Sequence, residues 1–289
     1  MKSASKIFLT AILSASLLFG GIPHAEAASS FVNLDEEIKK AVMATNDAEL
    51  VWIHSKSLSE KNTEISQIGD ITYSDSDDST YVGTAKLVNN TDDEQTLTSH
   101  SFSETTSDTL ETSVEEGISI GQEITASGEL LGIGAETTFS AEYSYGSSKT
   151  TSTSKEQTYV AEAQSVLVPA HSTRYVDVYM RKTIASGKVA LKTTLSGTVH
   201  FEWTQDFDDD GFASVDETRS LYDIFNDGVK AGYTLPSNLS LNHSNHTVEF
   251  QGVGTYTSKY GADFYVEVSS DEDIDTPSGV QSRKIITEN

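Results

Sequence analysis

Residues 110–146 alternate between polar and apolar side chains, and this alternation constrains the fold more than any other feature of the sequence. Successive side chains of a β-strand point to opposite faces, so an alternating segment forms a strand with one apolar and one polar face. The apolar residues occupy even positions up to Leu130 and odd positions from Ile133. Such a switch is required when a chain folds back on itself, so the pattern predicts a two-stranded hairpin with its apolar side chains on one face.

The predicted hairpin has an apolar tip, Leu130-Leu131-Gly132-Ile133, where a turn exposed to water would be polar. Residues 118–130 and 133–145 provide 13 residues each, and a strand needs ~9–11 residues to cross a bilayer. An ordinary half-buried antiparallel pair also alternates, but the tip, the length and the hydroxyl-rich polar face favour a hairpin that enters a membrane. The residues expected to face lipid are Ile118, Ile120, Ile124, Ala126, Leu130, Leu131, Ile133, Phe139, Ala141, Tyr143 and Tyr145.

A single hairpin cannot be stable in lipid. Its two edges would leave backbone N–H and C=O groups unpaired, which costs several kcal/mol for each group. Insertion therefore requires hairpins from other copies, and we expect a homo-oligomeric barrel in the membrane. Within each hairpin, the expected register joins positions whose numbers sum to 263, as in the pair of Ile124 with Phe139.

The polar face of the hairpin is acidic. No Lys or Arg occurs between Leu87 and Ser148. Rings of carboxylates attract cations and repel anions, so a closed barrel is expected to prefer cations. Glu116 and Gln122 are exceptions, because their even positions place them on the apolar face. The residues expected to line or rim the lumen are Glu111, Glu115, Glu123, Glu129, Glu136 and Glu142.

The first 27 residues have the composition of a secretory signal peptide. Lys2 and Lys6 precede an apolar run from Ile7 to Ile22, and Ala25-Glu26-Ala27 fits a cleavage site. We therefore expect a secreted, extracellular protein that reaches the membrane of a target cell only after export. No other apolar run approaches the ~20 residues of a transmembrane helix, so strands would have to cross the bilayer.

The charge balance limits the partners. Without the first 27 residues the chain has 17 basic and 43 acidic residues, a net charge near −26. Nucleic acid and anionic lipid headgroups are therefore poor partners. The sequence has no Cys, so no disulfide holds the fold.

The remaining sequence predicts a mainly β protein with a short helical N-terminal part. Asn33 and the acids that follow it can cap a helix, and Leu34, Ile38, Ala41 and Val42 share one helical face. Strands are expected at 86–88, 158–168, 175–182, 189–203, 248–256 and 264–268. The expected regions are a signal peptide (1–27), an N-terminal part (28–85) and a region that contains the hairpin (86–289).

Residues 206–217 match the calcium-loop pattern D-x-D-x-D-G-x5-E at every specified position. The glycine allows a sharp turn and the final glutamate can bind calcium through both oxygens. A solvated acidic turn is the alternative, because matches of this kind are more frequent in an acidic chain. The expected calcium ligands are Asp206, Asp208, Asp210, the carbonyl of Phe212, Ser214 and Glu217. A helix is expected to follow at Leu221, Ile224 and Phe225.

No motif in the sequence indicates catalysis. The seven histidines have no metal-binding spacing, and a nucleophile elbow, a phosphate loop and a dinucleotide fingerprint are all missing from the sequence. We therefore expect a protein that is not an enzyme and requires no cofactor, with calcium as the one possible ligand. The alternative to a pore is a secreted calcium-dependent binding or adhesive β protein.

The segment from Leu87 to Leu97, followed by Ser101-Phe102-Ser103, resembles the epsilon-toxin/mosquitocidal-toxin branch of the aerolysin-like β-pore-forming toxins. Further similar motifs lie at 142–145, 154–156, 166–170, 188–191, 195–197 and 252–256. The resemblance implies an elongated, mostly β protein with long antiparallel strands. It also implies a protein that binds a surface receptor, through an N-terminal part at 28–85. The aerolysin-like pore-forming region would be 86–289, and such proteins form rings and perforate membranes with the hairpin that matches 110–146.

The same resemblance bears on activation and docking. Many members of the family require proteolytic trimming, which implies cut sites at Lys39-Lys40 and Arg283-Lys284. The N-terminal part is shorter than in epsilon toxin, so receptor-binding residues cannot be transferred from it. Three aromatic residues are expected to be exposed and to contribute to docking, namely Trp52, Tyr73 and Tyr81.

Overall fold

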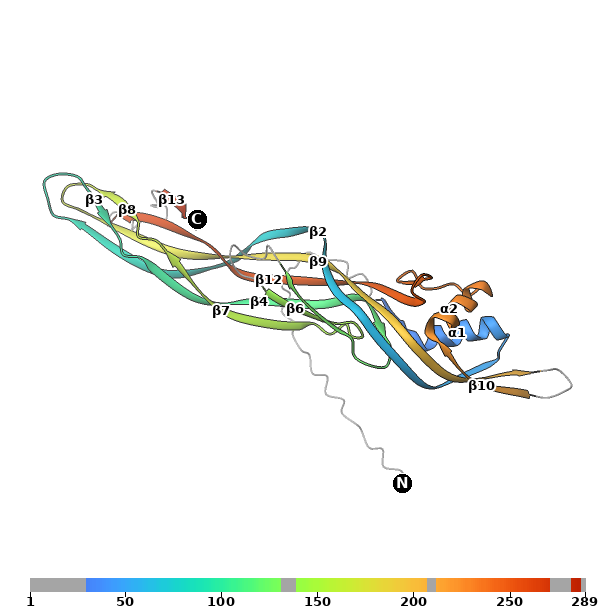
Figure 1. The fold of residues 1–289 in the computed structure, drawn as a ribbon. Coiled ribbons are helices and arrows are strands. Elements are labelled where there is room, and N and C mark those ends of the chain that lie inside the picture. Colours follow the sequence, from blue (N-terminus) through green and yellow to red (C-terminus); the bar gives the residue numbers. More distant parts are fainter. Residues whose placement is uncertain (1–29, 131–138, 207–211, 271–281, 287–289) are drawn as a thin grey trace, which may run out of the picture.

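The computed structural model describes residues 30–130, 139–206, 212–270 and 282–286 (Figure 1). The expected signal peptide lies outside the described residues. The molecule is elongated, with strands that run along most of its length and two helices at one end (Figure 1). This mainly β architecture of long antiparallel strands confirms the predicted fold class. Within the described residues, neither helix is long and apolar enough to span a membrane.

The two helices pack against each other at one end of the sheet. The side chain of Asn33 accepts hydrogen bonds from the backbone N–H groups of Asp35 and Glu36, which starts α1 (Leu34–Asn46). The four apolar residues expected on one face of α1 are all buried. Gly228 of α2 (Leu221–Lys230) lies against Ala41, where a Cβ atom would be 2.8 Å from the alanine Cβ. Both predicted helices are thus confirmed.

Three strands run most of the length of the molecule: β2 (Leu50–Asn89), β9 (Ser172–Asp206) and β12 (Thr247–Ser270). β9 pairs in antiparallel with β2 on one side and with β12 on the other. The predicted strands 175–182 and 189–203 are parts of β9, and 248–256 and 264–268 are parts of β12. The expected boundary after residue 85 falls inside β2.

Shorter strands complete the sheet. β4 pairs with β12 and with β7, β1 lies parallel to the end of β4, and β10 pairs with β9 beside the helices. β11 and β13 pair with β12, while β3–β8 and β5–β6 form two separate small sheets. The predicted strand 158–168 is divided between β7 and β8. The bounds of these strands are β1 Ser30–Asn33, β3 Gln95–Thr98, β4 Phe102–Ser119, β5 Thr125–Leu130, β6 Phe139–Ser144, β7 Thr151–Ala161, β8 Ser165–Val168, β10 Phe212–Ser220, β11 Leu239–Asn242 and β13 Ser282–Ile286.

The described side chains form two separate apolar cores. The larger core joins the helices to the middle of the sheet, and the smaller one includes Phe102, Val178 and Phe264. Between them, β4 buries polar residues, among them Asp108, which is 0% exposed. Asp108 accepts hydrogen bonds from the Tyr159 hydroxyl (2.6 Å) and the Gly261 N–H (3.2 Å). Burial raises the pKa of this carboxyl despite both hydrogen bonds.

Candidate membrane-insertion hairpin

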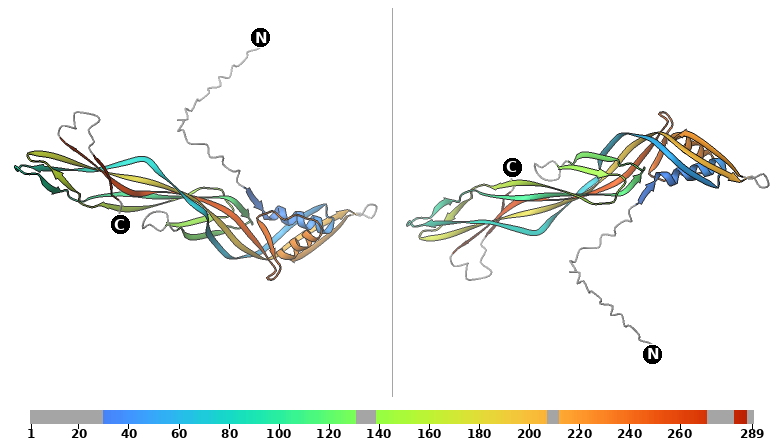
Figure 2. Two further views of the ribbon diagram at one scale, coloured as in Figure 1. Left: turned by 90° about the horizontal axis from the view of Figure 1, so that it is seen from above. Right: turned by 90° about the horizontal axis from the view of Figure 1, so that it is seen from below.

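The segment predicted as a hairpin contains part of β4, all of β5 and β6, and a bend between β4 and β5. The bend occupies residues 120–124, where Gly121 adopts a positive φ of 84° that favours glycine. Because of this bend, β5 and β6 leave the main sheet and form a two-stranded sheet along its side (Figure 2). The prediction of two strands that fold back is confirmed, but the first strand is interrupted.

The register of the hairpin differs from the expected one. Ala126 pairs with Tyr143 and Leu130 pairs with Phe139, so facing residue numbers sum to 269 rather than 263. The predicted pairing of Ile124 with Phe139 is therefore wrong. The reason is that alternation fixes only whether the sum is odd or even, and every odd sum places the same side chains on the same face. The apolar residues consequently still share one face.

That apolar face is buried against the body of the molecule. The members within the described side chains are Ile118, Ile120, Ile124, Ala126, Leu130, Ala141, Tyr143 and Tyr145, and each of them is at most 5% exposed. All eight belong to the larger core. Leu131, Ile133 and the side chain of Phe139 lie outside the described part of the chain.

The two tyrosines of the hairpin also make polar contacts with the long strands. The Tyr143 hydroxyl donates to the carbonyl of Thr255 (3.2 Å). The Tyr145 hydroxyl lies 3.1 Å from the carbonyls of both Glu64 and Lys192. Burial raises the pKa of both phenols, so they stay neutral donors. The apolar face is thus held by specific hydrogen bonds as well as by packing.

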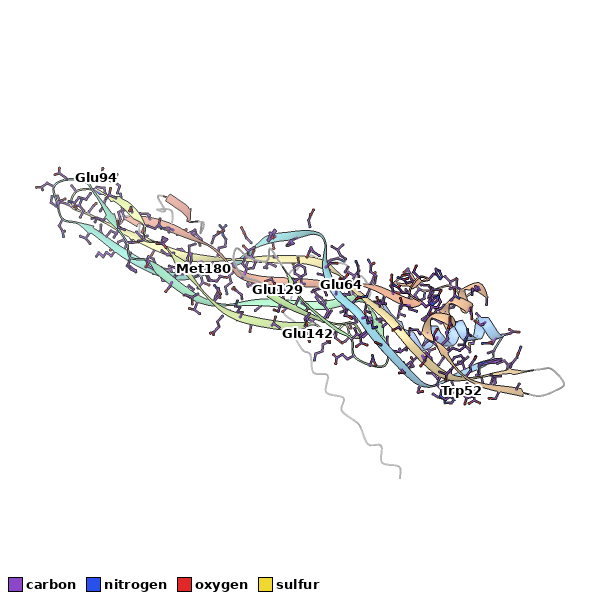
Figure 3. All side chains as sticks on the ribbon, in the orientation of Figure 1. Trp52, Glu64, Glu94, Glu129, Glu142 and Met180 are labelled. Atoms are coloured by element: carbon purple, nitrogen blue, oxygen red, sulfur yellow. The ribbon has the colours of Figure 1, made fainter. Side chains whose placement is uncertain are left out.

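The opposite face of the hairpin carries the predicted lumen residues. Glu111, Glu123, Glu129 and Glu142 are exposed, and Glu129 and Glu142 are labelled in Figure 3. Glu115 is half-buried and forms an ion pair of 2.8 Å with Lys188 of β9.

The remaining polar positions of the predicted hairpin are Glu116, Gln122 and Glu136. Glu136 lies outside the described residues. Glu116 and Gln122, the two polar exceptions on the apolar side, are exposed, and Gln122 donates to Glu60 at 2.8 Å. Neither of these polar side chains is therefore buried in the core.

Lys56 and β1 hold the bend in place, and neither contact was predicted from the sequence. Lys56 of β2 donates to the carbonyl of Ile120 (2.8 Å) and forms an ion pair with Asp35 of α1. β1 pairs with residues 116–119 of β4, and Phe31 covers Gly117, where a Cβ atom would be 2.3 Å from its ring. These partners lie far away in the sequence, so no local pattern marks them.

Known proteins resemble this chain in sequence and in fold. Residues 42–278 match the model of the family described as Clostridium epsilon toxin ETX/Bacillus mosquitocidal toxin MTX2. The chain belongs to this toxin family. The resemblance of the sequence motifs is therefore confirmed. Comparison with curated protein sequences gives no match.

Solved structures of similar fold support the same architecture. The β-pore-forming protein Mpp75Aa1.1 from Brevibacillus laterosporus has a TM-score of 0.66 and 17% identity, with 89% of this chain and 96% of that chain covered. The Cry23Aa1 and Cry37Aa1 binary complex gives 0.61 and 18%, with 90% and 97% covered. A non-toxic crystal protein from Bacillus thuringiensis gives 0.63 and 12%, with 84% and 98% covered. At these identities the comparison shows the fold alone.

The expected calcium loop is a strand pair in its described part. Phe212 of β10 pairs with Asp206 of β9, and the ladder continues to the pair of Ser220 with Thr198. Glu217 lies five residues along β10 and accepts a hydrogen bond from the Trp203 ring N–H (3.0 Å). Ser214 donates to Glu202 instead. A twelve-residue loop around one ion requires its first and last residues to converge, and this extended geometry keeps them apart.

The described residues contain no metal-binding cluster. Asp208 and Asp210 lie outside these residues. Within them, no group of three or more His, Asp or Glu side chains is arranged to hold a metal ion. The helix expected after residue 217 is present as α2, but it begins after a strand rather than after a calcium loop.

The three aromatic residues expected to dock are all exposed, but they do not share a surface. Trp52 faces Glu202 in the register of β2 with β9, Tyr73 faces Ala185, and Tyr81 faces Tyr179. They are therefore distributed along β2. Figure 3 shows Trp52 at the helical end and Met180, the residue after Tyr179, toward the other end.

The cut sites implied by the family lie in regular structure. Lys39 and Lys40 are inside α1, where they form ion pairs with Glu36 (3.0 Å) and Glu37 (2.7 Å). The backbone of Arg283-Lys284 pairs with β12 as part of β13. Proteases preferentially cut exposed loops, so cleavage at either site would require local unfolding.

Proposed function

We propose that the protein is a secreted toxin that binds a target-cell surface, oligomerises and inserts residues 110–146 as a transmembrane β-hairpin. The observation that carries this proposal is the two-faced hairpin. Its strands β5 and β6 form a small sheet of their own, and the described apolar side chains of the hairpin are buried. The opposite face is exposed, acidic and free of basic residues. Membership in a family of toxins supports the proposal.

The burial of the apolar face supports a soluble form that converts only at a membrane. Each large apolar side chain gains ~1.5–3 kcal/mol when it is removed from water. Detachment of β5 and β6 into water would lose this contribution for large side chains such as Leu130 and Tyr143. A bilayer offers the same side chains another apolar environment.

Ring assembly follows from the edges of the hairpin. In the described structure the β5–β6 sheet has two strands only, so its outer edges have backbone groups without a ladder partner in that sheet. In lipid these groups must pair with hairpins of neighbouring copies, and a closed barrel leaves no edge. The inward face would then carry the glutamates, which supports a preference for cations.

A disulfide that fixes the hairpin to the body tests the proposal. A Cβ atom at Gly128 would lie 2.5 Å from Cγ1 of Ile65 on β2, so Gly128→Cys with Ile65→Cys places two thiols within bonding reach. The chain has no other Cys. We expect the oxidised double variant to release no dye from target-cell vesicles, and reduction to restore release, because β5 can then leave β2.

A second disulfide serves as the control. Thr98 and Ser165 face each other in the β3–β8 sheet, with their hydroxyls 3.3 Å apart. This sheet takes no part in the proposed insertion, so oxidised Thr98→Cys with Ser165→Cys should release dye normally. Undiminished release from the verified Gly128–Ile65 disulfide would contradict insertion and favour the adhesive alternative.

A further inference from the structure

A row of tyrosines crosses three neighbouring strands in the half of the molecule away from the helices. Tyr81 of β2 meets Tyr179 of β9 edge to face, with ring centroids 5.5 Å apart. Tyr179 in turn stacks on Tyr265 of β12, at 5.0 Å and an interplanar angle of 10°. The alternate residues Val178 and Met180 belong to the smaller core, so this tyrosine row lies on the outer face of the sheet. Tyr81 is 55% exposed.

A cation and an anion lie beside the tyrosine row. Lys86 Nζ is 5.6 Å from the ring centroid of Tyr175. Asp177 stands between Tyr175 and Tyr179 on the same face of β9 and accepts a hydrogen bond from the Thr84 hydroxyl. Among the described residues, neither Lys86 nor Asp177 has an ion-pair partner within 4 Å. The two charges occupy ladder positions two residues apart, which corresponds to about 7 Å of strand.

We propose that this surface docks the phosphocholine headgroups of a lipid membrane. The trimethylammonium group would lie against the rings of Tyr81 and Tyr179 and near Asp177, and the phosphate would pair with Lys86. Aromatic faces attract quaternary ammonium groups through their quadrupole, and an ammonium side chain binds phosphate as a point charge. Tyrosine is also common at membrane interfaces, where its ring is half in apolar surroundings and its hydroxyl is hydrated.

The net charge of the chain favours a zwitterionic headgroup over an anionic one. A molecule near −26 is repelled by an anionic bilayer, whereas phosphocholine has no net charge and presents both signs at a short distance. The inference deepens the proposed function, on which it rests for the steps after docking, because it specifies the first contact of the soluble molecule with its target. The same residues would hold the molecule at the membrane before any hairpin leaves the body.

Co-sedimentation of the full mature chain with vesicles tests this docking surface. We expect partition onto phosphatidylcholine and little onto phosphatidylethanolamine or phosphatidylglycerol, with soluble phosphocholine as a competitor. Tyr81→Ala should weaken the partition about 3- to 30-fold, and Lys86→Gln should also weaken it. Tyr81→Phe keeps the ring and should bind normally. Leu167→Ala is the matched control, since Leu167 of β8 is an exposed large apolar residue outside the row.

The possible results separate this inference from the pore itself. Wild-type partition by Tyr81→Ala, or equal binding to phosphatidylcholine and phosphatidylethanolamine, would overturn the docking surface. If the docking surface is overturned but the oxidised Gly128–Ile65 disulfide still abolishes dye release, the proposed pore remains supported. If the disulfide leaves release unchanged while Tyr81→Ala lowers partition, the docking surface stands and insertion is wrong. The disulfide-linked protein should bind vesicles as tightly as the wild type in either case.

Discussion

At the scale of single residues, Asp108 sets a pH dependence that the sequence does not reveal. Its pKa is raised above the usual 3.8 because burial disfavours the charged form, while Tyr159, Gly261, Lys182 and Lys155 oppose that shift. The folded state therefore binds this proton more tightly than the unfolded state does, and the contribution of Asp108 to stability falls as pH rises through the raised pKa.

The variant Asp108→Asn removes this titration. The free energy of unfolding of the wild type, relative to the variant, is expected to increase as pH falls through the raised pKa and to become constant below 3.8. Urea denaturation of both proteins across that pH range measures the difference, and subtraction cancels the other carboxylates. Asp108→Ala provides the control for the hydrogen bonds, since it also removes the oxygen that accepts from Tyr159 and Gly261, and it should be about 1–3 kcal/mol less stable than Asp108→Asn at every pH. A difference that does not change with pH would refute the assignment.

At the scale of elements, the bend between β4 and β5 is expected to control the opening of β5 and β6. Lys56 joins the Ile120 carbonyl to Asp35, and its side chain is only 15% exposed. Hydrogen bonds to charged groups contribute ~1.5–3 kcal/mol, so Lys56→Gln should raise the opening of β5–β6 by about 10- to 100-fold. Hydrogen exchange of the amides in β5 and β6 measures this opening. Lys192→Gln breaks the exposed 4.0 Å pair with Glu64 and should leave exchange unchanged; equal protection in both variants would contradict the role of Lys56.

The elements also show which properties could be predicted. The faces of the hairpin and the buried side of α1 were predicted correctly because both depend on local periodicity. The register of the hairpin was not predicted correctly, because every pairing in which the two residue numbers have an odd sum satisfies the alternation equally well. Only a short part of β2, residues 86–88, was predicted as a strand. The reason is that β2 shifts its register with β9 at several irregularities, which break the alternation. The extended position of Glu217 could not be predicted from the calcium pattern, because it depends on pairing with β9, which is not local.

At the scale of the whole molecule, the positions of the glutamates distinguish a lumen from an ordinary acidic surface. Glu142 lies on the hairpin in the middle of the molecule, whereas Glu94 lies at the end away from the helices (Figure 3). Both are exposed, so they are equivalent for solubility and net charge. Only Glu142 would enter the barrel, where each subunit supplies one copy and a single substitution removes a whole ring of charge.

Planar-bilayer recordings under a salt gradient can therefore test the assignment of faces. The reversal potential of the wild-type pore is expected to have the sign that indicates a preference for cations. Glu142→Gln should lower the cation-to-anion permeability ratio by about two- to tenfold, since fewer carboxylates attract cations in the lumen. Glu94→Gln carries the same charge change and should leave the ratio unaltered. Anion preference in the wild type, or equal effects of the two substitutions, would mean that the acidic face of β5 and β6 does not line the conduit.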